Sequence, residues 1–204
     1  MNVTLASWQR LWGELGATVV NGGLMNQLVA AYSERQRHYH TLQHLRECLA
    51  QFDAAAMLAH RPAEVELALW FHDAVYDPQR KDNEERSADW ARASVLAAGC
   101  GAEAAERVAA LVLATRSHEA QADDADAALL LDIDLAILAA APGRFAEYER
   151  QVRAEYAHVP EAEFRAGRAR VLRGFLERDR IYLTDVFHDA LEARARDNLR
   201  RSLA

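Results

Sequence analysis

The histidines of this sequence gather in one stretch of the chain, where they stand close to carboxylates. Six of the eight lie between residues 38 and 118, at positions 38, 40, 44, 60, 72 and 118. His40 and His44 are four residues apart, so a helix would place both on one face. His72 is followed directly by Asp73, at the end of an apolar segment (residues 67–71). Burying an imidazole beside a carboxylate is costly unless both are satisfied, and a shared divalent metal ion satisfies both.

A second source of carboxylates is an apolar segment at residues 129–138, which contains Asp132 and Asp134. A segment that is apolar all round is typical of a buried helix. The two carboxylates would point about 200° apart around the helix axis, so they need different partners. Asp134 shares its face with Leu130 and Ile137 and is the better candidate for a metal site. We expect Asp132 to pair with an arginine or a backbone donor instead.

The elements that carry these residues are predicted to be helices throughout. Proline and glycine are scarce, at four and nine residues. Ala, Leu, Glu and Arg dominate over residues with strong β preference, which favours an all-α fold. Helical patterns cover residues 4–15, 24–35, 40–53, 62–76, 83–98, 102–118, 125–140, 143–157, 161–179 and 184–202. Thr184 is the expected N-cap of the last helix.

The length of the chain, 204 residues, corresponds to about one domain. No linker rich in Pro, Gly or Ser divides it. We therefore expect a single domain over residues 1–204, with a metal-binding core at about 35–140 and additional C-terminal helices at about 143–202.

The composition excludes several classes of function. A net charge of −7 argues against broad nucleic-acid binding and against binding to an anionic membrane. Lys81, the single lysine, lies outside any Walker-A pattern and is a poor basis for Schiff-base chemistry. Cys48 and Cys100 form no CxxC pair and are expected to be free thiols in a reducing cytosol. With no signal peptide or membrane span visible, we expect a cytoplasmic protein. Its oligomeric state stays open, with a homodimer as one arrangement.

Taken in order, the histidine and aspartate segments resemble the HD-domain superfamily of metal-dependent phosphohydrolases. The resemblance rests on His40, on the His72–Asp73 doublet and on Asp134. A bacterial subgroup of predicted HD hydrolases with no settled substrate is more similar still, from about residue 5 to residue 200. The shared motifs are Tyr39-His40…His44, His72-Asp73-Ala-Val-Tyr76, Asp82-Asn83-Glu84-Glu85-x-Ser87-Ala88, Thr115-x-x-His118 and Asp132-x-Asp134-Leu. The doublet alone is a weak signal, whereas the ordered set is a strong one.

The resemblance implies an HD-type helical bundle whose divalent ion is bound by His40, His72, Asp73 and Asp134. The ion would be Mn, Co, Ni, Fe, Zn or Mg, and it would activate a water molecule to hydrolyse a small phosphate ester, often a nucleotide. We expect catalytic roles for Asp73, Glu85 and His118. We expect the substrate pocket to include Arg37, His44, Asp77 and Arg116, with the arginines as phosphate ligands.

One position departs from the family pattern. Several HD hydrolases carry a glutamate three residues after the doublet aspartate, where this chain has Tyr76. The identity of a general base is therefore open. The departure favours an alternative, a non-catalytic binding or sensor protein on the same fold. The additional histidines His44 and His118 favour a third hypothesis, a di-iron oxygenase.

The chain contains an internal comparison for the doublet. Residues 187–190 repeat the Phe-His-Asp-Ala sequence of residues 71–74. The second copy lies in a charge-rich amphipathic helix near the chain end, and no further ligand-type segment follows it. We interpret His188 as a structural residue.

Overall fold

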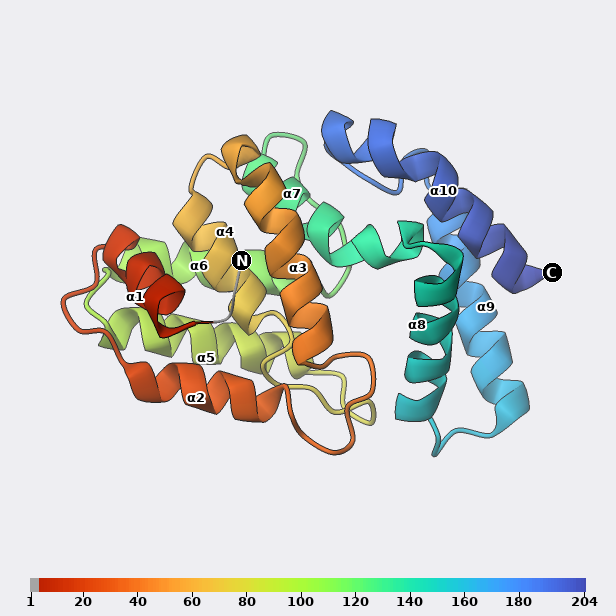
Figure 1. The fold of residues 1–204 in the computed structure, drawn as a ribbon, viewed down its shortest axis with the longest axis horizontal. Helices are drawn as coiled ribbons and strands as arrows, with labels where there is room; N and C mark the ends of the chain where they lie inside the picture. Colours follow the sequence, from red (N-terminus) through yellow and green to blue (C-terminus); the bar gives the residue numbers. More distant parts are fainter. Residues whose placement is uncertain (1–3) are drawn as a thin grey trace.

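The computed structural model describes residues 4–204, and these residues form an all-α fold with no β-strand (Figure 1). The α-helices are α1 (Leu5–Glu14), α2 (Gly22–Ala31), α3 (Leu42–Ala55), α4 (Pro62–Phe71), α5 (Asn83–Ala97), α6 (Ala102–Ala114), α7 (Ala125–Asp134), α8 (Pro142–Glu155), α9 (Glu161–Glu177) and α10 (Asp185–Leu203). Two short 3-10 helices, η1 (Ala56–Leu58) and η2 (Leu135–Ala139), follow α3 and α7. The all-α prediction is confirmed.

Helix α4 is the centre of the N-terminal bundle. Every residue from 64 to 71 is buried, and α4 contacts α1, α3, α5, α6 and α7. Pro62 begins the helix, where a missing backbone N–H costs nothing. The two buried glutamates of this range, Glu64 and Glu66, form ion pairs with Arg107 and Arg10. The His72–Asp73 doublet follows directly after Phe71, at the other end of the helix.

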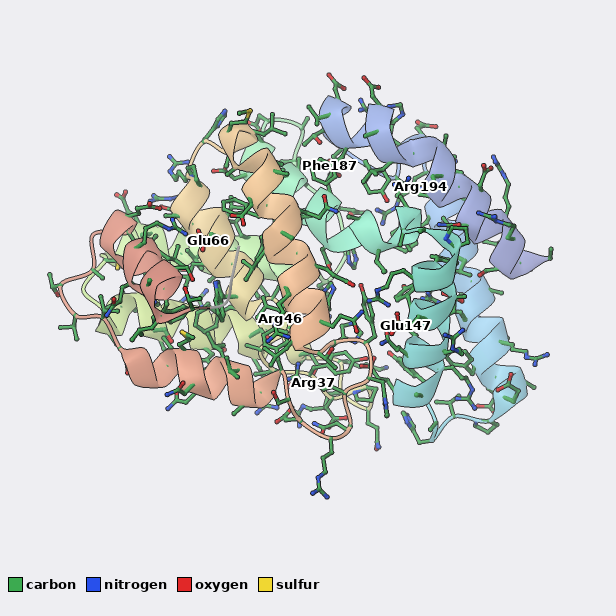
Figure 2. The ribbon with its side chains drawn as sticks, in the orientation of Figure 1. Arg37, Arg46, Glu66, Glu147, Phe187 and Arg194 are labelled. Atoms are coloured by element: carbon green, nitrogen blue, oxygen red, sulfur yellow. The ribbon has the colours of Figure 1, made fainter. Side chains whose placement is uncertain are left out.

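Helices α8, α9 and α10 form a separate layer beside this bundle (Figure 1). The 3-10 helix η2 connects the two parts, and both α8 and α10 contact it. Phe187 and Arg194 lie on the side of α10 that faces η2 (Figure 2), and Arg194 donates a hydrogen bond to the carbonyl of Ala139.

Several of the predicted helices end earlier than the sequence pattern indicates, and two of these ends bear on the site. The helix predicted for residues 62–76 ends at Phe71, and residues 72–82 form turns. The helix predicted for residues 125–140 changes to a 3-10 helix after Asp134. Side chains then donate hydrogen bonds to the backbone carbonyls of this segment. The Tyr182 hydroxyl donates to Leu135 O, and the Asn198 amide donates to the carbonyls of residues 138 and 140. The donors belong to α10 and to the segment just before it, so the sequence around residues 135–140 cannot predict this change of helix type.

Asp132 fixes the start of α10. Its fully buried carboxylate accepts hydrogen bonds from the backbone N–H of Leu183 (2.6 Å) and Thr184 (2.8 Å), and from the Thr184 hydroxyl (2.6 Å). Thr184 is also the N-cap of α10, as its sequence context predicts, with its hydroxyl accepting from Phe187 N. Asp132 therefore has backbone donors as its partners and points away from Asp134.

The role of Asp132 gives a first prediction. Asp132→Asn should lower the free energy of unfolding by about 2 to 4 kcal/mol, because an amide N–H₂ would then face N–H donors in a dry site. Asp185→Asn is the control, since Asp185 is the first residue of α10, next to the N-cap that Asp132 bonds, and its side chain is exposed. Urea unfolding measures both. An Asp132→Asn protein as stable as the control would contradict this anchoring role.

Candidate metal centre and cleft

Four ligand-type atoms converge where α3, the end of α4 and α7 meet. His44 Nε2 lies 3.0 Å from His72 Nε2, 3.2 Å from Asp134 Oδ1 and 3.4 Å from Asp73 Oδ2. His72 Nε2 lies 3.0 Å from Asp73 Oδ2 and 3.6 Å from Asp134 Oδ1. Bonds of about 2.1 Å to one ion, at angles between 90° and 110°, would separate neighbouring ligand atoms by about 3.0 to 3.4 Å. The spacing fits ligands of a single divalent ion.

Two of these atoms, His72 Nε2 and Asp73 Oδ2, have a lone pair available for a metal ion. His72 Nδ1 donates to Leu69 O at 2.7 Å, so Nε2 of the neutral ring carries no proton. Asp73 Oδ2 is buried and has no hydrogen-bond partner within residues 4–204. A buried carboxylate oxygen without a donor is costly. A cation among these acceptors would remove that cost.

Both carboxylates stay ionised in this environment. Burial alone would raise the pKa of Asp73, but the nearby His72 and His40 rings hold it well below its usual range. Burial likewise opposes ionisation of Asp134, while hydrogen bonds from His118 and His44 keep its pKa far below the usual value. The site therefore presents two negative charges to any ion that enters it.

Cys48 is a further potential ligand. The group of His44, Cys48, His72 and Asp134 has one ligand atom from each residue within 4.8 Å of the others, and could bind a metal ion. However, Cys48 Sγ lies 3.7 Å from both ring nitrogens of His44. An atom equidistant from the two nitrogens lies beside the ring, away from the direction of the Nε2 lone pair. Cys48 is a buried free thiol packed on His44.

His40, expected as a metal ligand, does not belong to this group, and His44 takes its place. Helix α3 begins only at Leu42, with Thr41 as its N-cap, so His40 precedes the helix and does not share a face with His44. The His40 ring stacks on Tyr76 with centroids 4.0 Å apart. Its Nδ1 donates to Glu155 Oε2 at 2.7 Å. The four-residue spacing of His40 and His44 predicts a shared face only if the helix begins at residue 40, two residues before its actual start.

Glu155 is the residue that the sequence analysis missed. This buried side chain of α8 accepts backbone N–H bonds from residues 38, 39 and 40 at Oε1, and the Tyr76 hydroxyl at Oε2 (2.8 Å). Burial alone would raise the pKa of Glu155, but the bonds from His40 and the backbone lower it to about 2. One glutamate in a charged amphipathic helix, 115 residues from His40, carries no sequence signal of this role.

His118 reaches the same centre from the loop after α6. Its Nε2 lies 3.2 Å from Asp134 Oδ2. The backbone of His118 has φ +51°, which is uncommon for a residue other than glycine. Arg178 supports this conformation by donating to the carbonyls of Ser117 and His118. Residues in such a backbone conformation, when neighbouring side chains hold them there, are often found at functional sites.

A cleft of about 480 Å³ opens beside the candidate metal centre. Asp73 and Asp134 are at its inner end, and it lies between the bundle and the C-terminal layer. Its polar and aromatic lining comprises Tyr39, His40, Asp73, Tyr76, Arg80, Lys81, Asn83, Glu84, Thr115, Arg116, His118, Asp134, Tyr148, Tyr156 and Arg168. Arg116, an expected pocket residue, is among them and pairs with Glu85.

Arg37 and Asp77, also expected in the pocket, do not line the cleft. The guanidinium of Arg37 is buried and donates to the carbonyls of Asp73 (2.6 Å), Ala74 (3.0 Å) and His40 (3.3 Å). It holds the backbone of the doublet and has no face left for phosphate. The Asp77 carboxylate accepts from Gln79 N within a turn. Glu85, expected to be catalytic, reaches the cleft only through its ion pair with Arg116.

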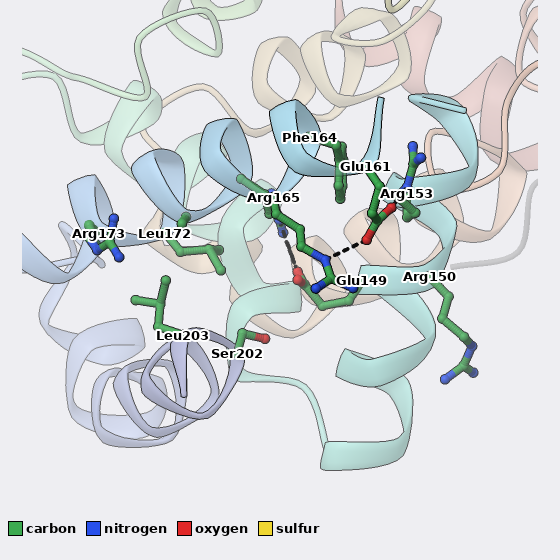
Figure 3. Close-up of a pocket in the computed structure, with 12 residues that line it drawn as sticks. Glu149, Arg150, Arg153, Glu161, Phe164, Arg165, Leu172, Arg173, Ser202 and Leu203 are labelled. Atoms are coloured by element: carbon green, nitrogen blue, oxygen red, sulfur yellow. Dashed lines mark hydrogen bonds and ion pairs between the residues drawn. The ribbon is translucent and has the colours of Figure 1, made fainter. Parts of the chain in front are cut away.

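A second cavity, of about 490 Å³, lies among α8, α9 and α10 (Figure 3). In it, Arg165 and Arg153 pair with Glu161, and Arg168, which also lines the cleft, pairs with Glu149. It contains no histidine or aspartate. We therefore take the cleft at the metal centre as the candidate functional site.

The second Phe-His-Asp-Ala sequence lies on the surface of α10. His188 Nδ1 is 3.3 Å from Asp189 Oδ1, and the Asp189 side chain is 83% exposed. No other ligand-type group joins them within residues 4–204. The two copies therefore differ in what surrounds them, and the exposed one serves as a control for the buried one.

A scan of protein-family models, a search of curated proteins and a search of solved structures found no match to this chain. Within residues 4–204, every helix is too short or too polar to span a bilayer.

The bonding of Glu155 predicts a pH-dependent mutational effect. Its pKa is lowered from 4.5 to about 2, so the ionised carboxylate stabilises the fold above pH 4.5 and loses this effect as the pH falls toward 2. In metal-free protein, Glu155→Gln should lower the free energy of unfolding by about 2 to 4 kcal/mol at pH 6, and by less at pH 3. Glu147→Gln on the same helix is the control. An equal loss at both pH values would contradict the assignment.

Proposed function

We propose that this protein is a metal-dependent phosphohydrolase. The proposal is carried by one observation. Four ligand-type atoms, from His44, His72, Asp73 and Asp134, converge, and one of them, Asp73 Oδ2, is buried without a hydrogen-bond donor. Two imidazole nitrogens and two carboxylate oxygens suit Mn, Fe, Co, Ni or Zn. The ion would polarise the phosphoryl group and lower the pKa of a bound water.

In this proposal, the ligands are His44, His72, Asp73 and Asp134, with Asp73 preferred over Cys48. Asp73 Oδ2 lies in front of both imidazole Nε2 atoms, whereas Cys48 Sγ lies beside the His44 ring. His118 steadies the second oxygen of Asp134. Leu69 O orients His72, which is the supporting contact that metal-bound imidazoles usually make.

The cleft suits a phosphate ester by its charge. Arg80, Lys81, Arg116 and Arg168 line it. The three arginines pair with Asp82, Glu85 and Glu149, so a phosphate group would compete with these carboxylates for their N–H donors. Arginine binds phosphate oxygens well because its planar fork can donate two parallel hydrogen bonds. The tyrosine rings in the lining offer flat surfaces for the organic part of the ester, as a nucleotide would require. These features support a small phosphate ester as the substrate.

Metal content tests the ligand assignment. His72→Ala and Asp73→Asn should each lose the divalent ion that the wild-type protein holds, because each removes a ligand atom. His188→Ala and Asp189→Asn make the same changes in the exposed copy of the motif and should keep it. Elemental analysis of the four folded variants provides the measurement. Unchanged metal in the first pair would refute the centre, and two irons per chain would favour the oxygenase hypothesis.

Phosphate release tests the reaction. The metal-loaded protein should hydrolyse members of a panel of nucleotides and phosphate esters, and chelator should abolish the activity. Asp134→Asn should reduce the rate at least about 100-fold, because an amide cannot supply the anionic oxygen. Asp132→Asn, two residues away, should keep the rate per folded molecule. Release that persists after verified metal removal would rule out this mechanism.

A further inference from the structure

We propose that the cavity among α8, α9 and α10 binds a small anionic amphiphile, a molecule with a carboxylate or phosphate head and an apolar chain. The volume of the cavity, about 490 Å³, lies within the range of small-molecule sites. Among the residues that line this cavity and the cleft at the metal centre, Arg168 is the one in common. The inference therefore does not depend on the proposed function.

The lining of this cavity carries an excess of positive charge. Two glutamates, Glu149 and Glu161, face five arginines. The arginines are Arg150, Arg153, Arg165, Arg168 and Arg173. Because the whole chain has a net charge of −7, this excess is local and opposite in sign to the charge of the molecule. Charges of one sign gathered around a concave surface attract a counter-ion from solution.

The two glutamates of the lining are already engaged. Glu161 accepts hydrogen bonds from Arg153 Nε at 2.8 Å and from Arg165 Nε at 2.6 Å. Glu149 Oε1 accepts a hydrogen bond from Arg168 Nε at 3.2 Å. Three arginines thus use both carboxylates, and the other two arginines of the lining have no glutamate of the cavity left to pair with.

These two arginines, Arg150 of α8 and Arg173 of α9, make no hydrogen bond or ion pair within residues 4–204. They lie at opposite ends of the cavity (Figure 3). A guanidinium can donate two parallel hydrogen bonds to a carboxylate or a phosphate. An anion in this cavity would therefore meet donors that no glutamate holds, whereas Arg80, Arg116 and Arg168 of the cleft are all paired.

Part of the cavity wall is apolar. Phe164, Ala169 and Leu172 of α9 and Leu203 of α10 belong to the lining, and Leu172 is buried. Figure 3 shows Leu172 and Leu203 at the end of the cavity where Arg173 lies. A guanidinium beside an apolar wall suits an anionic head joined to a hydrocarbon chain, because the head gains charge-assisted hydrogen bonds while the chain leaves water. An inorganic anion would use the arginines alone, and an uncharged hydrocarbon would use the wall alone.

Binding of simple amphiphiles tests the site. Octyl phosphate or octanoate, titrated into the full chain below its micelle concentration, should saturate one site. It should bind at least about tenfold more tightly than 1-octanol or inorganic phosphate, each of which offers half of the recognised chemistry. Isothermal titration calorimetry measures all four compounds, and the tighter of the two amphiphiles identifies the head group.

Substitutions locate the site in the molecule. Arg150→Gln combined with Arg173→Gln should weaken binding of the amphiphile at least about tenfold, because both unpaired guanidiniums are lost. Arg170→Gln, on α9 but outside the cavity lining, should match wild type. Arg116→Gln, which removes an arginine of the cleft, should also match wild type. All four positions are exposed, so the variants should fold, and circular dichroism checks this.

Three outcomes would overturn the inference. The first is that neither amphiphile shows saturable binding to the wild-type protein. The second is that 1-octanol binds as tightly as the amphiphiles, since the arginines would then have no part in recognition. The third is a loss of binding in Arg116→Gln as large as in the double variant, which would place the amphiphile in the cleft. Metal content and phosphate release test the proposed function separately, so a failure of one proposal leaves the other standing.

Discussion

The buried carboxylate of Glu155 joins the C-terminal helices to the segment that approaches the candidate site. Five donors converge on it: three consecutive backbone N–H groups, the His40 ring and the Tyr76 hydroxyl. A carboxylate removed from water needs such compensation. Satisfying it fixes α8, the segment before α3 and the turn after the doublet in one arrangement. The shape of the cleft depends on this arrangement, because both of its sides meet there.

The cleft is consequently a product of two layers. The N-terminal bundle supplies the converging atoms of His44, His72, Asp73 and Asp134. The C-terminal layer adds Arg168 to the lining, and Arg178 holds the strained loop at residue 118. The buried carboxylate of residue 132 connects α7 to the start of α10 in the same way that Glu155 connects α8 to the bundle. Buried acidic side chains bonded to backbone N–H groups thus hold the layers together.

Local patterns predict most of the fold and part of the site. Helix periodicity and Pro or Gly punctuation locate all ten helices between residues 4 and 204, because these signals act within a few residues. The separation of Asp132 from Asp134 also follows from helix geometry alone. The predicted places of His40 and Arg37 fail for physical reasons. His40 depends on a helix start at Leu42, and Arg37 is recruited by carbonyls of residues 73 and 74, which lie distant in the chain.

Tyr76, where the sequence differs from the HD hydrolases that it resembles, contacts Glu155, the residue that the sequence analysis missed. Several HD hydrolases place a glutamate three residues after the doublet. Here Tyr76 instead donates its hydroxyl to a glutamate from α8 and stacks on His40. A carboxylate is therefore present next to this position, although a different helix supplies it. Glu155 bonds His40 through Nδ1, and the His40 side chain lines the cleft. The structure thus provides a carboxylate at this position from a different helix, and that carboxylate orients the His40 ring.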